Sequence, residues 1–490
     1  MKDSLKHRTI HALSWSFIES IGVQIVQFII SIILARILFP AQFGLIGMLT
    51  IFIAVAQTFL NSGFGTALIQ KQDATQTDMC SVFYFNIIVG IVASGLLSIA
   101  APWIAEFYNQ PELTSLTRAL SLTIIINSFG LIQTTIVTKE INFKTLTKVS
   151  IISSILSGII GIVMAYKGYG VWSLVYQQIS RAFLSTLLLW IFNTWRPSPL
   201  FSIKSLQEMF SFGSRMLASG LLDQIFNNIY LLVIGKLFSA ADLGYFTRSK
   251  TLQELPSQTL AGMVGRVTFP VFSAIQDDRE RLKSGMKKAL TSLALLNFPM
   301  MVGISLIARP LIIVLFTEKW IESIPYLRLL CFLGFLYPMH LINLNVLQAL
   351  GRSDLFFRLE IIKKILIVIN IAVTWRWGIS AMIYGMIVNT IVSYYLNAYY
   401  NKILINYSIR EQLFDLFPYL VVTIIMGLGV YIVGLPPYPN QLILLLVQIF
   451  TGAIIYVILC RVFRLTIFME IWDIGLNKFI KSKDNTFSDF

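Results

Sequence analysis

The sequence predicts an all-α integral membrane protein with about fourteen transmembrane helices, on the evidence of its composition and of its long apolar runs. Hydrophobic residues make up 56% of the chain and charged residues only 13%, whereas soluble domains carry about 25% charged residues. A transmembrane helix needs about 20 apolar residues, and such runs follow one another along nearly all 490 residues. This composition excludes an ordinary soluble domain.

Fourteen apolar segments are predicted to cross the membrane, and the loops between them are short. Gly and Pro occur inside several segments, which membrane helices tolerate. The short outer loops argue against a large catalytic domain outside the membrane. The approximate cores are residues 12–37, 43–67, 80–104, 116–137, 149–166, 170–194, 207–235, 246–274, 289–316, 325–349, 359–375, 379–400, 413–434 and 440–461.

The distribution of basic residues predicts the orientation. An even number of spans places both termini on one side, and loops on that side hold most of the 38 Lys and Arg residues. The opposite loops hold few. Because cytoplasmic loops are enriched in Lys and Arg, we expect both termini in the cytoplasm. The basic residues of the opposite loops are Arg36, Lys167, Lys236, Arg309, Lys319 and Arg376.

An internal repeat divides the chain. The run Arg36-Ile-Leu-Phe-Pro-Ala-Gln-Phe-Gly44 matches Lys236-Leu-Phe-Ser-Ala-Ala-Asp-Leu-Gly244, and Gly170-Val-Trp-Ser-Leu-Val echoes Gly378-Ile-Ser-Ala-Met-Ile. Six spans per copy make the repeat parallel, an arrangement that suits alternating access with a site between the halves. The predicted organisation is an N-terminal lobe (1–195), a cytoplasmic linker (196–206), a C-terminal lobe (207–402), two extra spans (403–465) and a cytoplasmic tail (466–490).

Polar residues recur at helical spacing inside four predicted spans. Because an ionisable side chain at the centre of a bilayer costs about 2.5–3.5 kcal/mol, such residues need partners or water. One interpretation is a water-filled cavity between the two halves, and the other is polar contacts that hold helices together. The candidate substrate-binding residues are Arg181, Arg215, Lys250, Arg266, Gln24, Gln27 and Asn227, and the candidate counter-ion or coupling residues are Glu19, Asp223 and Glu254.

The surplus of arginine favours an anionic ligand, because guanidinium groups bind phosphate oxygens in pairs. The acids either neutralise these arginines when substrate is absent or bind a coupling cation, H⁺ or Na⁺; no other cofactor is expected. Arg118, Arg248 and Arg328 are expected to lie near the interfaces with their charged ends in water. His340 is expected to be a hydrogen-bonded packing residue.

The sequence lacks the motifs of catalytic and metal sites. It has no GxxxxGK[ST] phosphate loop and no HExxH, and Cys80, Cys331 and Cys460 have no CxxC or Cys/His partner. We expect these thiols to pack in the protein interior. Asp277 and Asp278 suggest a metal or glycosyl-transfer site, but their charged neighbours favour a solvated loop or helix end. No nucleic-acid partner is expected, and the chain is predicted not to be an enzyme.

Several motifs together resemble the polysaccharide transporters of the MOP superfamily, and the WzxC-like oligosaccharide flippases in particular. The likeness extends over about residues 8–465. The motifs are Leu34-Ala-Arg-Ile-Leu-Phe-Pro-Ala-Gln-Phe-Gly44, Gly168-Tyr-Gly-Val-Trp-Ser-Leu-Val175, Ile234-Gly-Lys-Leu-Phe-Ser-Ala-Ala-Asp-Leu-Gly-Tyr245, Thr268-Phe-Pro-Val-Phe-Ser-Ala-Ile-Gln-Asp-Asp278, Phe316-Thr-Glu-Lys-Trp320 and Leu347-Gln-Ala-Leu-Gly-Arg352.

This resemblance implies a V-shaped bundle of two lobes that exports a polyprenyl-pyrophosphate-linked oligosaccharide across the bacterial inner membrane. The product would enter lipopolysaccharide, capsule or exopolysaccharide, with a polysaccharide polymerase and glycosyltransferases as possible partners beside membrane lipid. A MATE-like cation-coupled exporter of small molecules is the alternative, and a lipid II-type flippase a further one. The MATE alternative calls for an acidic cavity, whereas the polar residues here are mainly basic.

Overall fold

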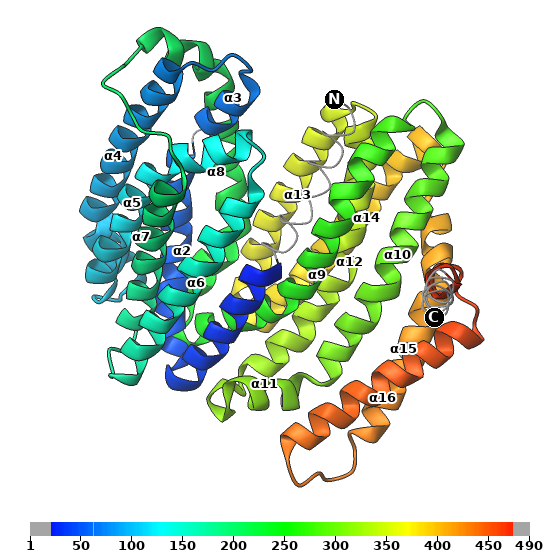
Figure 1. Ribbon diagram of the computed structural model, residues 1–490. Coiled ribbons are helices and arrows are strands. Elements are labelled where there is room, and N and C mark those ends of the chain that lie inside the picture. Colours follow the sequence, from blue (N-terminus) through cyan, green and yellow to red (C-terminus); the bar gives the residue numbers. More distant parts are fainter. Residues whose placement is uncertain (1–20, 62, 474–490) are drawn as a thin grey trace, which may run out of the picture. The chain divides into compact units, whose positions relative to one another are not determined.

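The computed structural model describes residues 21–61 and 63–473, and within these ranges the chain is helical and contains no strand (Figure 1). The predicted all-α fold class is thereby confirmed. Glu19 and the end of the 466–490 tail lie outside the described residues. A helix at Ile21–Ile37 opens the described chain.

The helices that follow match the predicted spans in order. They are α2 (Pro40–Leu60), α3 (Phe64–Gln70), α4 (Gln76–Tyr108), α5 (Leu113–Lys139), α6 (Phe143–Tyr166), α7 (Trp172–Phe192), α8 (Ile203–Leu237), α9 (Ala240–Ala274), α10 (Arg279–Leu306), α11 (Ala308–Phe316), α12 (Ser323–Ala349), α13 (Ser353–Thr374), α14 (Ile379–Ile405), α15 (Ile409–Val433) and α16 (Gln441–Val462).

Ten spans in the described part of the chain are long and apolar enough to cross a membrane. The other four predicted spans also form helices, namely Ile21–Ile37, α7, α9 and α13. The described part of the first is short, and α7 and α9 carry the charged candidate residues Arg181, Lys250, Glu254 and Arg266. Their polarity is the reason that hydropathy by itself does not select them.

Two of the predicted spans, 43–67 and 289–316, contain a break in the helix that the sequence prediction did not include. The first break lies between α2 and α3, where Gly63 has a φ of 78°. A Cβ added to Gly63 would lie 2.8 Å from Met216 Cβ and 2.9 Å from Gly213 Cα, both in α8. The second break lies at Ile307, between α10 and α11. Asn61 and Gly63 lie at the first break, and Arg309 and Pro310 follow the second, but the surrounding runs are apolar enough to be predicted as single spans.

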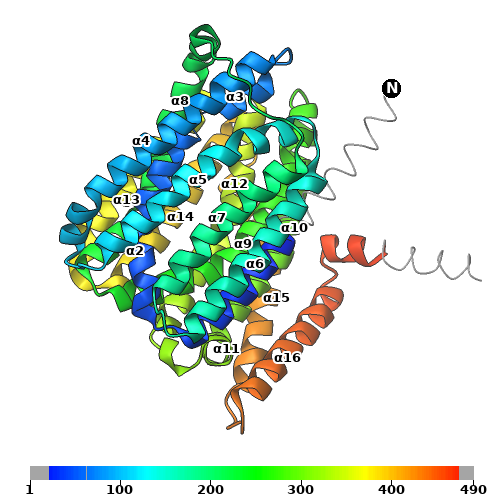
Figure 2. The ribbon, with the colours of Figure 1, turned by 60° about the vertical axis from the view of Figure 1, so that its left-hand side comes forward.

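The chain divides into two compact units, Met1–Thr247 and Arg248–Phe490. In the first unit α4 packs on α5, α5 and α6 both pack on α7, and α2 packs on α8 (Figure 2). In the second unit α12 packs on α10 and α14, and α10 packs on α15, which pairs with α16. The domain limits at 195 and 207 stay a prediction.

The two copies of the predicted repeat form the same corner in the first unit. One helix ends at Ile37 and α2 begins at Pro40, while α8 ends at Leu237 and α9 begins at Ala240. At the first corner the Phe39 N–H donates to Gln42 Oε1 (3.0 Å), and at the second the Ser239 N–H donates to Asp242 Oδ2 (3.2 Å). Each side chain thus caps the start of its own helix.

The starts of α2 and α9 also contact each other reciprocally through glycine. A Cβ added to Gly44 would lie 1.7 Å from the Ala240 carbonyl oxygen, and one added to Gly244 would lie 2.0 Å from the Pro40 oxygen. These pairs are equivalent under the offset of the repeat. Close backbone approach of this kind is the reason that small residues gather at membrane helix interfaces.

The second echo of the repeat marks another matched corner. Gly170 precedes α7 with a φ of 57°, and Gly378 precedes α14 with a φ of 90°. L-residues with side chains rarely adopt such angles, so glycine is the residue that permits both turns. The two echoes found in the sequence therefore correspond to repeated local structure.

We expect Gly244→Val to unfold or severely destabilise the protein, because its side chain would overlap the Pro40 carbonyl. Overpacking costs about 1–3 kcal/mol, and backbone overlap costs more than a flexible contact. Gly262→Val in the same helix is the control, because nothing lies within 4 Å of a Cβ there. Thermal unfolding of both variants in detergent measures the difference, and equal melting temperatures would contradict the reciprocal contact.

Candidate functional site

Gln27 and Arg181 are the first pair of predicted site residues that the fold brings together. Gln27 lies in the helix Ile21–Ile37 and Arg181 in α7. With its amide turned so that Oε1 faces the guanidinium, Gln27 accepts hydrogen bonds from both amino groups of Arg181. The carboxamide therefore fixes the direction of the guanidinium, whose five N–H donors exceed the two used here.

Three further candidates share one face of α8. Arg215, Asp223 and Asn227 are spaced by multiples of four residues, and all three side chains are exposed in the structure. Spacing of this kind places side chains on one side of a helix. Gln24 and Asp223 also make polar interactions. The predicted stripe on this helix is therefore present as one polar face.

Lys250, Glu254 and Arg266 lie on α9, in the second unit. Lys250 Nζ is 3.7 Å from Glu254 Oε1, and both side chains are partly exposed. This is a helical i,i+4 ion pair, so Glu254 neutralises a basic candidate within its own helix. Arg266 is exposed further along α9. Glu19 lies outside the described residues, and the roles of all ten candidates stay predictions.

Arg248 is buried rather than placed at an interface with its charge in water, which corrects the sequence prediction. Its side chain is 7% exposed. The guanidinium carbon lies 5.2 Å from the centre of the Phe316 ring and 5.5 Å from that of Trp320. An arginine over aromatic faces is held by cation–π attraction, which strengthens when water is excluded. The sequence shows that Phe316 and Trp320 are present, but it does not show that they lie close to Arg248.

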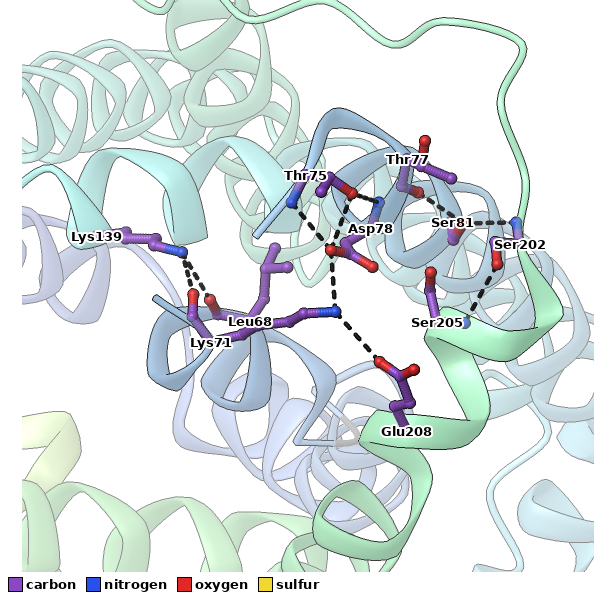
Figure 3. Close-up of polar contacts among 10 residues, drawn as sticks. All are labelled: Leu68, Lys71, Thr75, Thr77, Asp78, Ser81, Lys139, Ser202, Ser205 and Glu208. Atoms are coloured by element: carbon purple, nitrogen blue, oxygen red, sulfur yellow. Dashed lines mark hydrogen bonds and ion pairs between the residues drawn. The ribbon is translucent and has the colours of Figure 1, made fainter. Parts of the chain in front are cut away.

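A charged cluster where α4 and α8 begin was not predicted (Figure 3). Lys71 Nζ lies 3.1 Å from Asp78 Oδ2 of α4 and 3.3 Å from Glu208 Oε2 of α8. Lys139 at the end of α5 donates to the carbonyl oxygens of Leu68 and Lys71. The cluster thus ties α4, α5 and α8 to the segment that follows α3.

Asp78 is the buried centre of this cluster. Its side chain is 3% exposed, and its carboxylate accepts from the Thr75 N–H (2.9 Å) and hydroxyl (3.0 Å). The hydrogen bond to Asp78 raises the pKa of the Lys71 ammonium, so Lys71 stays charged at physiological pH. The only sequence signal for the cluster is the Thr-x-x-Asp pattern of a helix cap at residues 75–78.

The structure confirms the structural, non-functional roles expected for three other features. Asp278 caps α10 by accepting from the Arg281 N–H at 3.0 Å, so it lies at a helix end as expected. His340 Nδ1 lies 3.2 Å from Asn397 Nδ2, and its ring packs edge-on against Tyr394. Cys80, Cys331 and Cys460 are free and buried.

A family model described as "Polysaccharide biosynthesis protein" matches residues 33–325. The chain belongs to this family. The match covers the corner after the first helix, all of α2 to α11, and the start of α12. The resemblance inferred from the sequence motifs is therefore confirmed at the level of the family.

Relatives of known name are similar along most of their length. The lipopolysaccharide biosynthesis protein WzxC of Escherichia coli is 27% identical over 87% of this chain and 89% of its own. The teichuronic acid biosynthesis protein TuaB of Bacillus subtilis is 28% identical over 72% and 74% of the two chains. The succinoglycan biosynthesis transport protein ExoT of Rhizobium meliloti is 27% identical over 78% of both.

Solved structures show which fold this family member has. The lipid II flippase MurJ in an inward closed conformation matches with a TM-score of 0.76 at 15% identity, over 92% of this chain and 98% of that chain. An inward-facing multidrug resistance MATE transporter of the MOP superfamily matches with a TM-score of 0.63 at 17% identity, over 78% and 94%. The chain therefore has the same fold as these two transporters.

A double-mutant cycle on Gln27→Leu and Arg181→Met tests whether these two residues act as a pair. We expect a coupling of about 1 kcal/mol, because either change removes the same hydrogen bonds. Thermal unfolding of both single variants and the double variant in nanodiscs measures this coupling. Fully additive losses would contradict the pairing.

We expect Asp78→Asn to lower the free energy of unfolding by about 1–3 kcal/mol, because a buried charged hydrogen bond is lost. Glu208→Gln is the matched change on the other side of Lys71. Glu208 is 51% exposed, so we expect at most about 1 kcal/mol from it. Chemical unfolding in detergent measures both, and a larger loss in Glu208→Gln would contradict this ranking.

Proposed function

We propose that this protein flips a polyprenyl-pyrophosphate-linked oligosaccharide across a bacterial inner membrane by alternating access. The observation that carries this proposal is the near full-length similarity to named polysaccharide biosynthesis proteins, one of them named as a transport protein. Family membership and a MOP-type fold support it. The product would serve lipopolysaccharide, capsule or exopolysaccharide assembly.

The polar residues supply the chemistry that such a substrate calls for. A pyrophosphate carries several charged oxygens, and arginine binds pairs of these oxygens with its planar fork. Arg181 is oriented by Gln27, and Arg215 and Arg266 are exposed on α8 and α9. We assign these three arginines to the pyrophosphate, with Lys250, Gln24 and Asn227 as further contacts.

The membrane arrangement that we propose has fourteen spans and both termini in the cytoplasm. Two parallel repeats of six spans would form the lobes, 1–195 and 207–402, with two extra spans at 403–465. The matched corners at Pro40 and Ala240 support the repeat, and the bias of basic residues supports the orientation. Parallel halves of this kind change access by rocking about the site.

The energy source is part of the proposal. The sequence has no nucleotide-binding loop, so we infer that the carrier uses a cation gradient or the substrate gradient itself. Asp223 and Glu254 are the described acids that would bind H⁺ or Na⁺, and Glu254 already faces Lys250. No covalent chemistry is assigned to the chain. Glycosyltransferases and a polymerase would act before and after it.

A MATE-like exporter of small cationic molecules is the second candidate function. A solved MATE transporter has the same type of fold. A site for cations needs a surplus of carboxylates, whereas Arg181, Arg215, Lys250 and Arg266 outnumber Asp223 and Glu254. The charge balance therefore favours the anionic, lipid-linked substrate, whether its glycan belongs to a polysaccharide or to lipid II.

Replacing Arg181, Arg215 and Arg266 together by Ala tests the assignment. In a cell that lacks its own flippase and is complemented by this protein, we expect surface polysaccharide to fall at least tenfold, since three charged contacts of about 1.5–3 kcal/mol each are lost. Arg279→Ala with Arg281→Ala is the control, because both side chains are exposed at the start of α10. Immunoblots of polymer and membrane protein measure the result.

Undiminished polymer at a normal level of the triple variant would overturn the arginine assignment. If the unmodified protein restores no polymer for any of several donor glycans, the flippase proposal itself fails. Resistance of the same cells to cationic dyes, gained on expression of the protein, would favour the MATE-like alternative.

A further inference from the structure

A polar cavity of about 180 Å³ lies within the first unit, between α2, α5 and α7. Each helix contributes residues at helical spacing, such as Gln57 and Asn61 at the end of α2. The cavity shares no residue with the candidate pyrophosphate contacts. It is lined by Gln57, Leu60, Asn61, Asn127, Gly130, Leu131, Thr134, Ser185, Thr186 and Leu189.

The lining is polar but carries no charged side chain. Its polar members are amides and hydroxyls, and its apolar members are three leucines and a glycine. Thr134 donates to the Gly130 carbonyl oxygen (3.2 Å) and Thr186 to that of Ile126 (3.1 Å). Both threonine hydroxyls are therefore satisfied as donors and keep the capacity to accept a hydrogen bond.

The other four polar side chains have hydrogen-bonding capacity to spare. Over the described residues 21–61 and 63–473, no hydrogen bond involves the side chains of Gln57, Asn61, Asn127 or Ser185. In a membrane, an unsatisfied polar group costs several kcal/mol. Gln57, Asn127 and Ser185 are half-buried and Asn61 is exposed, so all four are accessible to a ligand. A hydroxyl-bearing ligand would satisfy them together.

Close packing sets the size of the cavity. A Cβ on Gly130 would lie 2.8 Å from Thr186 Oγ1, so α5 and α7 meet at this glycine. The volume of about 180 Å³ corresponds to about six water molecules in the liquid. That space suits one sugar ring and is small beside the sites of drug-sized ligands, which measure about 300–1,000 Å³.

We propose that this cavity, lined by Gln57, Asn61, Asn127 and Ser185, binds a single neutral sugar ring of the transported glycan. The amides would bond pairs of ring hydroxyls, each group both donating and accepting, while Leu60, Leu131 and Leu189 would contact the C–H faces of the ring. The inference rests on the proposed function and adds a specificity site for the sugar apart from the arginines.

The chemistry of the lining selects against other ligands. A phosphate or uronate would find no cation there, and a bare Na⁺ would find no carboxylate and a space far wider than its ligand shell. In the proposed orientation α2, α5 and α7 all run toward the cytoplasm, and the cavity residues lie in the later halves of these helices. A ring bound there is near the side on which the glycan is made.

Ligand-detected NMR on the full-length protein in nanodiscs tests the binding. The probes are the methyl glycosides of glucose and galactose, methyl glucuronoside and NaCl. We expect saturation transfer to at least one neutral glycoside, and about a tenfold weaker affinity in Asn127→Leu and in Ser185→Ala, since one or two hydrogen bonds are lost. Ser180→Ala is the control in α7, because its hydroxyl bonds within the helix and lies outside the cavity.

Three outcomes would overturn the proposal: equal binding by Ser185→Ala and Ser180→Ala, a preference for the glucuronoside, or Na⁺ binding that Asn127→Leu abolishes. Complementation separates this proposal from the proposed function. If the unmodified protein restores polymer and Asn127→Leu with Ser185→Ala restores as much with every donor glycan, the sugar site fails and the flippase stands. If the unmodified protein binds neutral glycosides but restores no polymer, the flippase proposal fails.

Discussion

Inside a bilayer no water is available to the peptide groups, so each N–H and C=O must find a partner within the protein. An all-helical chain meets this requirement, and the described residues contain no strand. The same constraint makes every polar side chain within a helix informative. Such a group is paired, lies on an exposed polar face, or contributes to a cavity, and this chain contains all three cases.

The paired groups stabilise contacts between helices. Gln27 orients Arg181, and Asn401 Nδ2 donates to Asn343 Oδ1 at 2.8 Å within the second unit. Arg248 is accommodated differently, since the rings of Phe316 and Trp320 cover its guanidinium. Cation–π attraction to these rings stabilises the buried charge, so an arginine in a span need not belong to the transport path.

Small residues are the second feature that holds the helices together. Lipid tails are as apolar as leucine, so helices gain little from hydrophobic contact and associate by close packing. Gly44 and Gly244 allow two equivalent helix starts to approach within backbone contact. The charged cluster around Asp78 adds ion pairs where α4 and α8 begin. Close packing at the starts of α2 and α9 and ion pairs at the starts of α4 and α8 therefore both stabilise the first unit.

The sequence by itself determined the all-α membrane class, the order of the helices, the matched corners and the family, because each depends on local patterns such as apolar run length, spacing and glycine. It also located polar faces on α8 and α9. Only the tertiary structure decided that Arg248 is buried, that Lys71 joins Asp78 to Glu208, and that Asn127 and Ser185 line one cavity. These facts depend on residues far apart in the chain, and the period of a helix gives the direction of a side chain but not the helix that it meets.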